Sequence, residues 1–403
     1  MLSQPVFERR TATPVCPFFY ECGGCDAQDV PYADQLSAKQ AWAELLFAPL
    51  LGEHTDKRPI IGEASEFPVY FRNKIRFSFI RDNDDVVHPS RHRKGSTSSD
   101  IPVDQCFLQS PESDSLINWV AAWATQEKWS LYDPTTKQGW LKHLLIRQGK
   151  HTGDLLVSTV ADTPGVPDEK RWVSAITQAF PGITSLHHSQ SYPQQPARIT
   201  TRLLAGKEKL TEKVGEYTFV ISPHAFFQTN GTMVETLYSE VQRQAGEGEI
   251  AWDLYAGSAT IGLFVSKNFT KVVSIEQNPA NIADAQENLT LNGVSNIDVV
   301  AGTVEDRITS AFFTSNGPAN AIIIDPPRAG IHPNLRTILP TIVKQSPGAK
   351  LVYVSCNPST ALRDCAVFVQ AGLRITTFQP IDMFPHSIHC EIVMTLEAPK
   401  ANK

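Results

Sequence analysis

The pattern of hydrophobic and polar positions changes near residue 221. From there on, continuous apolar runs such as "IAWDLYA", "KVVSIEQ", "NAIIIDPP" and "KLVYVSCNP" alternate with helical stretches such as "NPANIADAQENLTLNG". Strands read as continuous apolar runs when helices cover both faces of a parallel sheet. The pattern therefore predicts an α/β fold with a doubly wound parallel sheet for residues 221–403.

Two further regions precede this one. Residues 61–220 contain short alternating stretches such as "YFRNKIRFSFI" and "GDLLVSTVA", which are typical of half-buried antiparallel strands. Residues 1–60 begin with the cysteine-rich stretch "CPFFYECGGCDAQ" and continue with apolar positions at helical spacing in "PYADQLSAKQAWAELLFAPLL". We therefore expect a mainly β central domain and a small N-terminal cysteine-rich region.

The composition is that of a globular protein and argues against a membrane protein or a non-specific polyanion binder. The chain has 403 residues, of which 41% are hydrophobic and 19% are charged, and this is typical of a globular protein with two or three domains. No apolar run reaches the roughly 18 residues of a membrane span, and the N-terminus lacks the apolar core of a secretory signal. These features predict a cytoplasmic protein without a membrane partner. The net charge of −6 argues against a non-specific polyanion binder.

One segment is basic despite this overall charge. Residues 70–94 contain seven Lys and Arg against three Asp, with four aromatic residues interleaved. Such a segment can contact RNA phosphates while its rings stack on unpaired bases, so we expect it to hold RNA within the central domain. The alternative is an ordinary solvated strand face.

A candidate cofactor site lies at the ends of two predicted strands. In "WDLYAGSATIGL", Asp253 ends the first strand and Gly257 opens a turn where a ligand can approach the backbone. Glu276 ends the next strand about twenty residues later, where a carboxylate can accept both hydroxyls of a ribose. The pattern indicates an adenosine-containing ligand. Because the loop lacks a full G-x-G-x-x-G, we expect S-adenosylmethionine rather than NAD.

Two more strand ends carry candidate chemistry. Asp325 is followed by two prolines that fix an extended loop, and Cys356 ends the next strand before a turn at Asn357 and Pro358. A thiolate in this position can add to carbon 6 of uracil, which makes carbon 5 able to accept a methyl group. The alternative for Cys356 is a small core residue.

The same chemistry needs a base that removes the proton from carbon 5. The segment "DMFPHSIHCEIVMTLE" offers Glu391 at the start of the last strand, and we expect Glu391 to be the base, with His386 and His389 shaping its surroundings. The alternative is a solvated edge carboxylate. Because the target base must leave its stack to meet Cys356, we expect the substrate to be a loop or bulge of RNA.

Four cysteines form a candidate metal site. Cys16, Cys22 and Cys25 lie on a tight turn with spacings of five and two residues, and Cys106 is the natural fourth thiol. Four thiolates can bind zinc or an iron–sulfur cluster, and the spacing differs from the paired short knuckles usual for zinc. Free cysteines are the remaining alternative.

Five blocks carry a family resemblance. "SPHAFFQTN", "DLYAGSATIGL", "IDPPRAG", "VSCNPSTALRD" and "DMFPHSIHCE" occur in the order found in the RNA uracil-5-methyltransferase family, which uses S-adenosylmethionine. The chain resembles this family from about Cys16 to the last strand, which implies a Rossmann-like methyltransferase domain. The resemblance implies Cys356 as nucleophile and Glu391 as base. It also implies a set of residues that bind the methyl donor: Gln228, Tyr255, Gly257, Thr260, Glu276 and Asp325.

The resemblance bears on substrate and cluster as well. Residues 256–259 read "AGSA" where relatives commonly have Cys-Gly-x-Gly, which leaves contacts from Ser258 and Thr260 open. The cysteine set resembles the ribosomal RNA branch, which implies a [4Fe-4S] cluster with a folding or RNA-contact role, ligated by Cys16, Cys22, Cys25 and Cys106. It implies a monomer that methylates 23S ribosomal RNA and does not act on DNA. The alternatives are the T-loop uridine of transfer RNA and a non-catalytic RNA-binding or assembly factor.

Overall fold

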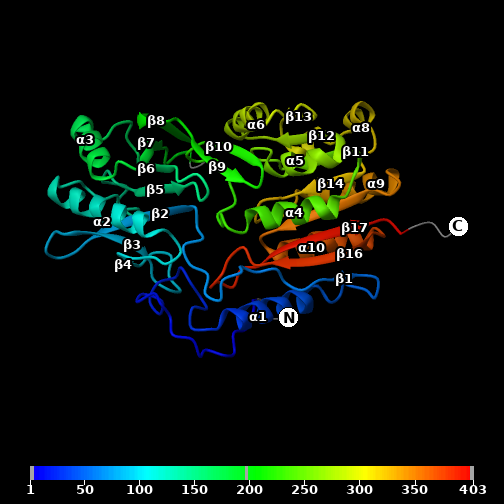
Figure 1. Ribbon diagram of the computed structural model, residues 1–403, viewed down its shortest axis with the longest axis horizontal. Helices are drawn as coiled ribbons and strands as arrows, with labels where there is room; N and C mark the ends of the chain where they lie inside the picture. The colour runs from blue at the N-terminus through cyan, green and yellow to red at the C-terminus, as the bar shows by residue number, and fades with distance from the viewer. Residues whose placement is uncertain (1–3, 196–197, 400–403) are drawn as a thin grey trace.

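The computed structural model describes residues 4–195 and 198–399, and these form three β-sheets with helices around them (Figure 1). The C-terminal sheet has eight strands in the order β1-β16-β17-β15-β14-β11-β12-β13, and the central sheet has seven in the order β4-β3-β2-β5-β6-β7-β8. A two-stranded hairpin of β9 (Leu210–Val214) and β10 (Tyr217–Ile221) lies between them in sequence. No helix in the described residues has both the length and the apolar composition that a bilayer span requires.

The C-terminal sheet confirms the predicted α/β fold. Five of its strands are parallel to one another: β11 (Gly248–Leu254), β12 (Phe269–Glu276), β13 (Ile297–Ala301), β14 (Ala321–Ile324) and β15 (Lys350–Ser355). β11 is the first of these strands in sequence. β12 and β13 follow it on one side in the sheet, and β14 and β15 lie on its other side. Ligands of doubly wound folds bind at this switch point, beyond the carboxyl ends of the strands.

Three strands extend this parallel core. β17 (Glu391–Glu397) is antiparallel to both β15 and β16 (Arg374–Ile381), and the short β1 (Asp56–Lys57) from the N-terminal region pairs in parallel with β16. The sheet is therefore mixed at this end. Its N-terminal edge strand shows that residues before the central domain complete the C-terminal sheet.

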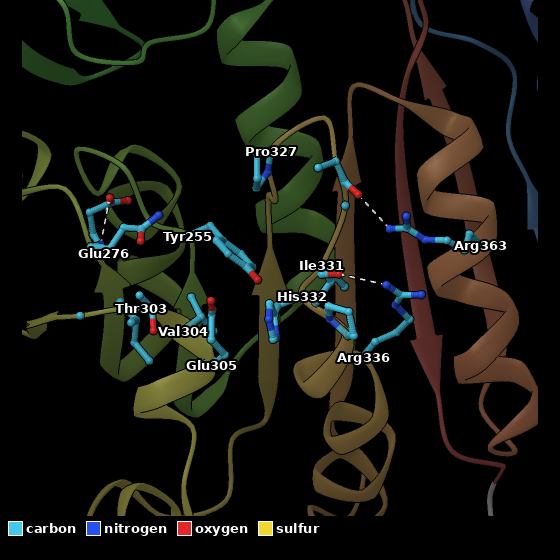
Figure 2. Close-up of a pocket in the computed structure, with 16 residues that line it drawn as sticks. Tyr255, Glu276, Thr303, Val304, Glu305, Pro327, Ile331, His332, Arg336 and Arg363 are labelled. Atoms are coloured by element: carbon cyan, nitrogen blue, oxygen red, sulfur yellow. Dashed lines mark hydrogen bonds between the residues drawn. The ribbon is translucent and has the colours of Figure 1, made fainter. Parts of the chain in front are cut away.

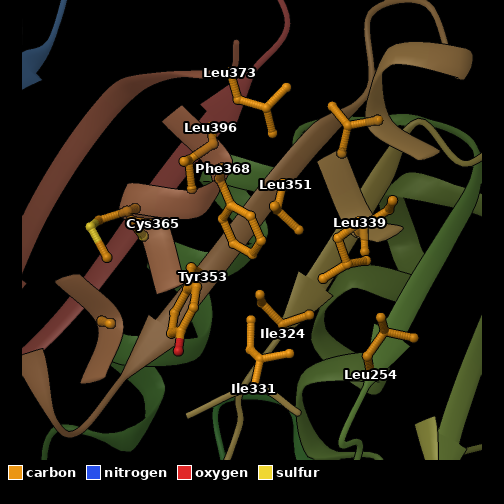
Figure 3. Close-up of a cluster of buried hydrophobic side chains, with 14 of the residues drawn as sticks. Leu254, Ile324, Ile331, Leu339, Leu351, Tyr353, Cys365, Phe368, Leu373 and Leu396 are labelled. Carbon is orange, nitrogen blue, oxygen red and sulfur yellow. The ribbon is translucent and has the colours of Figure 1, made fainter. Parts of the chain in front are cut away.

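Helices cover both faces of this sheet, which explains the continuous apolar runs. Side chains of successive strand residues point to opposite faces, so Ile322 and Ile324 join one core while Ile323 joins the other. Figure 3 shows the first core, where Phe368 packs near Leu351 and Tyr353. Its helices are α1 (Tyr32–Phe47), α7 (Val304–Arg307), α8 (Ser310–Asn316), α9 (Pro333–Gln345) and α10 (Pro358–Gln370). The second core uses α4 (Val234–Ala245), α5 (Thr260–Val265), α6 (Pro279–Leu291) and the β9-β10 hairpin, and the 3-10 helix η1 (Ser266–Asn268) follows α5.

The central sheet is antiparallel except at one pair, as the alternating pattern predicted. Its strands are β2 (Lys74–Arg81), β3 (Val87–His92), β4 (Asp100–Pro102), β5 (His143–Gln148), β6 (Leu155–Ala161), β7 (Ile183–Ser191) and β8 (Ile199–Gly206). β6 and β7 are parallel because α3 (Glu169–Ala179) connects them as a crossover. α2 (Pro111–Gln126) and α3 pack on one face, where Trp129 and Trp172 belong to the buried core.

The two large sheets meet through the segment that precedes α4. Asn73 donates a hydrogen bond of 2.8 Å to the backbone oxygen of Gln228, and Arg72 forms an isolated bridge with Asn230. The buried Arg147 of β5 donates to the backbone oxygens of Pro223 and Ala225. These bonds hold the central domain against the carboxyl edge of the parallel strands, as Figure 1 shows.

Candidate functional site

The predicted nucleophile and base lie at facing strand ends. Cys356 follows the last residue of β15, and Glu391 is the first residue of β17. Ser355 pairs with Ile392 in the antiparallel β15-β17 ladder, so the next residues of the two strands, Cys356 and Glu391, approach each other beyond it. Directly opposite residues in such a ladder have Cα atoms about 5 Å apart. The fold therefore brings a thiol and a carboxyl group to one place, although 35 positions separate them in sequence.

A small cavity of about 190 Å³ opens onto Cys356. Arg328, Asn357, Pro358 and His389 contribute to its lining. Cys356 is half-buried, and burial raises the pKa of its thiol to about 12, with a further increase from the charges of Glu391 and Asp325. The guanidinium of Arg328 acts in the opposite direction and lowers the pKa. The resting thiol is protonated, and its ionisation depends on the charges beside it.

Glu391 is a buried carboxyl group without a partner. Its side chain is 1% exposed, and neither carboxylate oxygen has a hydrogen-bond partner among the described residues. Burial raises the pKa of Glu391 well above its usual value, and the nearby Asp325 raises it further while Arg328 lowers it. A carboxyl group with a raised pKa is a stronger base once ionised, and no hydrogen bond from the described residues occupies its oxygens.

Arg328 was not identified from the sequence, although it lies within the block "IDPPRAG". Its backbone oxygen accepts hydrogen bonds from Asn357 Nδ2 at 3.0 Å and Thr360 Oγ1 at 3.2 Å. These bonds tie the loop after β14 to the start of α10, and so they place the guanidinium beside Cys356. The Pro-Pro pair predicted a rigid loop, but it gave no indication of which side chain the loop presents.

A second cavity, of about 380 Å³, lies at the carboxyl ends of β11, β12 and β14 (Figure 2). Tyr255 and Glu276 line it together with Thr303, Glu305 and His332. The sequence identified the first two of these residues and missed the other three: Thr303 and Glu305 lie at the start of α7, and His332 precedes α9, where no motif marks them. The cavity has the size of a small-molecule site and stands beside the topological switch point.

The turn after β11 is held in place by Glu276. Glu276 accepts hydrogen bonds from the backbone N–H groups of Gly257 at 2.8 Å, Gln277 at 3.0 Å and Asn278 at 2.7 Å. Gly257 has φ of 57°, in the left-handed region that favours glycine. A carboxylate has about four lone-pair positions, so Glu276 keeps acceptor capacity beyond these three N–H groups.

The other predicted donor-binding residues lie around this cavity and do not line it. Gln228 is buried and donates a long hydrogen bond of 3.4 Å to Asp325, whose pKa is raised to about 7 by burial and by Asp253. Thr260 is buried at the start of α5. Asp325 is close enough to Cys356 and Glu391 for its charge to raise the pKa of both, and Gln228 is hydrogen-bonded to Asp325.

The two histidines of the last block have different positions. His389 lines the cavity of Cys356. His386 is fully buried and contacts Gln35 and the backbone oxygen of Pro68, and burial lowers its pKa to about 4. His386 therefore joins α1 to the segment before β17 as a neutral structural residue.

The four cysteines of the predicted metal site gather around one small cavity, although Cys106 lies 81 positions after Cys25. Burial raises the pKa of Cys25 to about 12 and that of Cys16 to about 11, and Cys106 raises both further. Backbone and side-chain N–H groups point at two of the sulfur atoms: Gly24 donates to Cys22, and Gln28 donates to Cys25, both at 3.4 Å. In residues 4–195 and 198–399, however, no group of three or more His, Cys, Asp or Glu is arranged to hold a metal ion.

The basic segment of residues 70–94 does not form one continuous surface. Arg81 pairs with Asp85, Arg93 pairs with Glu21, and Arg91 lies over the ring of Phe77. The four counted aromatic residues include Phe71, Phe77 and Phe79, which are all buried. Most of this segment is therefore committed to intramolecular contacts.

Comparisons with known proteins point to one family of RNA-modifying enzymes. Residues 201–399 match the family tRNA (Uracil-5-)-methyltransferase. A protein of Bacteroides thetaiotaomicron named an uncharacterized RNA methyltransferase is 31% identical over 96% of this chain and 88% of its own length. A Porphyromonas gingivalis protein with the same description is 32% identical over 95% of this chain and 86% of its own.

One solved structure is similar over nearly the whole chain. It is the tRNA (uracil-54, C5)-methyltransferase of Pyrococcus abyssi in complex with S-adenosyl-L-homocysteine. The TM-score is 0.73 at 26% identity, and the match covers 92% of this chain and 84% of that one.

Proposed function

Because this chain belongs to the RNA uracil-5-methyltransferase family, whose members use S-adenosylmethionine, we propose that it methylates carbon 5 of a uridine in 23S ribosomal RNA through a covalent adduct with Cys356. The observation that carries the proposal is the meeting of Cys356 and Glu391 at facing strand ends. The same observation speaks against a non-catalytic assembly factor, which needs neither a placed thiol nor an unpartnered buried carboxyl group.

The methyl donor fits the larger cavity. Glu276 would hold the ribose hydroxyls there and Tyr255 would line the donor's site, with Gln228 and Asp325 as further residues that would bind the donor. Gly257 lets the backbone approach the ligand, and Thr260 supports the turn from the start of α5. When bound, S-adenosylmethionine supplies a methyl group carried on a positively charged sulfur.

The protein groups then act in a fixed order. The thiolate of Cys356 forms a bond to carbon 6 of the uracil, and the electron pair of the 5,6 double bond moves into the enolate of carbon 4. That electron density makes carbon 5 the nucleophile that takes the methyl group. Ionised Glu391 next removes the proton from carbon 5, the double bond re-forms, and the sulfur of Cys356 leaves as thiolate. Arg328 stabilises the thiolate at the start and the end of this sequence.

The substrate assignment rests on the cysteine set. The resemblance ties such a set to the ribosomal branch of the family, and the four thiols lie around one cavity. We propose that Cys16, Cys22, Cys25 and Cys106 ligate a [4Fe-4S] cluster. Their number and chemistry fit a cluster, and N–H donors point at two of the sulfur atoms. The cluster has no part in the methyl transfer, which moves no electron to or from a metal.

Transfer RNA is the second candidate substrate, because the similar Pyrococcus abyssi enzyme acts on uracil 54 of transfer RNA. The two candidates are separated by incubating the purified protein with labelled methyl donor and either large-subunit ribosomal RNA or transfer RNA, both from cells that lack this protein. We expect 5-methyluridine in the ribosomal RNA only. Label confined to transfer RNA would contradict the proposed substrate while leaving the chemistry in place.

A further inference from the structure

A fourth cavity, of about 660 Å³, lies at the junction of the central and C-terminal domains. It is lined by residues of β2, β7 and β8, by the segment 222–225, and by the start of α6, which Figure 1 places across the junction from β7 and β8. The volume is within the range of ligand sites, roughly 300–1,000 Å³. Neither the methyl donor nor the target base occupies it in the mechanism above.

Positive charges in this cavity lack partners. Lys74 and Arg76 are two positions apart on β2 and therefore point to the same face, and both line the cavity. No hydrogen bond or ion pair joins either side chain to another residue in the part of the chain that the structure describes. Lys74 instead stands directly opposite the buried Arg147 in the β2-β5 ladder. Like charges directly opposite each other are destabilising, and a bound anion would reduce this repulsion.

The ionisation of Lys74 reflects this environment. Burial lowers its pKa to about 7, and the positive charges of Arg147 and Arg76 lower it further. Lys209, which also lines the cavity, already pairs with Asp284 and Glu287. Glu208 is the one acidic residue among the described residues that line the cavity. The protein's own carboxylates therefore leave Lys74 and Arg76 uncompensated, and a bound anion would be stabilised beside them.

His187 provides an independent indication of a ligand. It lines the same cavity, is 3% exposed, and its Nδ1 atom has no hydrogen-bond partner among the described residues. Its Nε2 atom lies 2.8 Å from the hydroxyl of Ser185, which donates its own hydrogen to the backbone oxygen of Lys207. Nε2 must then carry the ring hydrogen. Burial lowers the pKa of His187, against the opposing effect of the backbone of Arg202 and Lys207, and this favours the neutral ring. In that tautomer Nδ1 is a buried acceptor to which no described residue donates.

The cavity lies close to the proposed reaction site along the same sheet edge. Asn278, which lines it, comes two residues after Glu276 at the end of β12. β12 and β15, whose last residue precedes Cys356, are three strands apart in the sheet. Three strand spacings correspond to about 14 Å, a distance that a few nucleotides of an RNA strand can span.

We propose that this cavity binds a sugar–phosphate unit of the RNA strand next to the target uridine. Lys74 and Arg76 contact the phosphate oxygens, and His187 Nδ1 accepts a hydrogen bond from the ribose 2′-hydroxyl. A nucleotide of RNA has the anion and the donor that the cavity lacks, whereas DNA has only the anion. This inference rests on the proposed function, because it takes RNA as the substrate.

The test compares Lys74→Gln, Arg76→Gln and their double variant with Lys170→Gln, which removes an exposed lysine on α3. Binding of a transcript of large-subunit ribosomal RNA is measured at several salt concentrations. We expect the double variant to bind about tenfold more weakly at low salt. The slope of log K against log salt should be less steep by about 0.7 for each phosphate that the protein no longer neutralises. We expect kcat at saturating RNA to change less than twofold. Lys170→Gln should match the wild type.

Two further measurements distinguish a loss of RNA binding from a loss of folding: the melting temperature of the variants and the RNA preference of a second variant. The melting temperature of Lys74→Gln without RNA should stay the same or rise, because an unpartnered charge has been removed. His187→Ala should reduce the preference of the protein for the transcript over its DNA copy. If the Lys74 and Arg76 variants keep both the affinity and the salt slope of the wild type, the inference is wrong.

A further measurement with inorganic phosphate distinguishes a site for a free anion from a site for the phosphate groups of RNA. If about 20 mM inorganic phosphate raises the melting temperature of the wild type but not of the double variant, while RNA affinity is equal in both, the cavity holds a small anion and the proposal fails. If the wild type methylates neither ribosomal nor transfer RNA, the proposed function is wrong, but the inference about the cavity is not thereby contradicted. The binding comparison would still decide the role of the cavity.

Discussion

Lys39 Nζ lies 2.7 Å from Asp382 Oδ1, and neither side chain has any exposed surface. Asp382 also accepts hydrogen bonds from the hydroxyl of Tyr32 at 3.0 Å and from the backbone N–H of Phe384 at 3.1 Å. This ion pair joins α1 to the segment that leads into Glu391. A helix from the N-terminal region therefore fixes the position of the proposed base.

Breaking this pair should destabilise the protein. Lys39→Met leaves a buried carboxylate without its cation, and such a change typically costs about 3–5 kcal/mol. The free energy of unfolding in urea measures it. We expect the double variant Lys39→Met/Asp382→Leu to recover most of that stability but to remain slow in methylation, because the segment before Glu391 is no longer anchored. Full activity in the double variant would show that the pair contributes only to stability.

Variants of Cys356 and Glu391 should differ in whether they accumulate a covalent protein–RNA complex, and this difference distinguishes the roles of the two residues. In Glu391→Gln, addition of the thiolate and methyl transfer still occur, but the proton on carbon 5 stays in place. We therefore expect a covalent protein–RNA complex that appears as a heat-stable shifted band on a denaturing gel. Cys356→Ala should give neither product nor shifted band, and its RNA affinity should be unchanged. A Cys356→Ala protein that methylates normally would contradict the proposed nucleophile.

The residues at the ends of the parallel strands could be predicted from the sequence, but the pairing of one strand with another could not. Each continuous apolar run stops at a polar residue, so Glu276, Asp325 and Cys356 were expected at one edge of the sheet, where they are found. The pairing of β17 with β15 is a contact between distant segments, and apolar periodicity does not reveal strand partners. Glu391 could therefore be proposed only as a candidate base, whereas the ladder register places it beside Cys356.

Contacts made by loops and by the N-terminal helix were not predictable for a similar reason. The spacing of apolar residues in α1 shows that one face is buried, but it does not show that this face packs on the C-terminal sheet. Arg328 and Thr303 reach their cavities because of loop conformation, which depends on tertiary hydrogen bonds such as that from Asn357 to the Arg328 backbone. Sequence patterns describe local structure, and these contacts are not local.

The cysteine cluster can be tested by its metal content. Cys22→Ser removes one proposed ligand, whereas Cys365→Ala changes a fully buried cysteine in the core of the C-terminal domain and serves as the control. After anaerobic purification we expect about four iron and four sulfide per wild-type or Cys365→Ala chain, with brown colour, and a large decrease of both in Cys22→Ser. Stoichiometric zinc without iron in the wild type would contradict the proposed cluster.

The electrostatic role of Arg328 predicts a specific pH dependence. Reaction requires the thiolate of Cys356 and ionised Glu391, and burial raises the pKa of both groups, that of Cys356 to about 12. The ionised fraction of each group grows as pH rises, so kcat/KM should increase from about pH 6 to about pH 9 without a plateau near the ordinary thiol pKa.

Arg328→Met removes the positive charge that lowers both of these pKa values. A hydrogen bond to a charged group is typically worth about 1.5–3 kcal/mol, so kcat/KM at neutral pH should fall about 10-fold to 100-fold. The pKa of Cys356 lies above this pH range in both proteins, so the thiolate fraction falls by the same factor at each pH. The deficit should therefore persist from about pH 6 to about pH 9, and Arg328→Lys should restore part of the rate. The rate at which iodoacetamide alkylates Cys356 without RNA should fall by a similar factor in Arg328→Met, because only the thiolate reacts. An unchanged alkylation rate would show that Arg328 acts through substrate binding or loop structure rather than on the ionisation of Cys356.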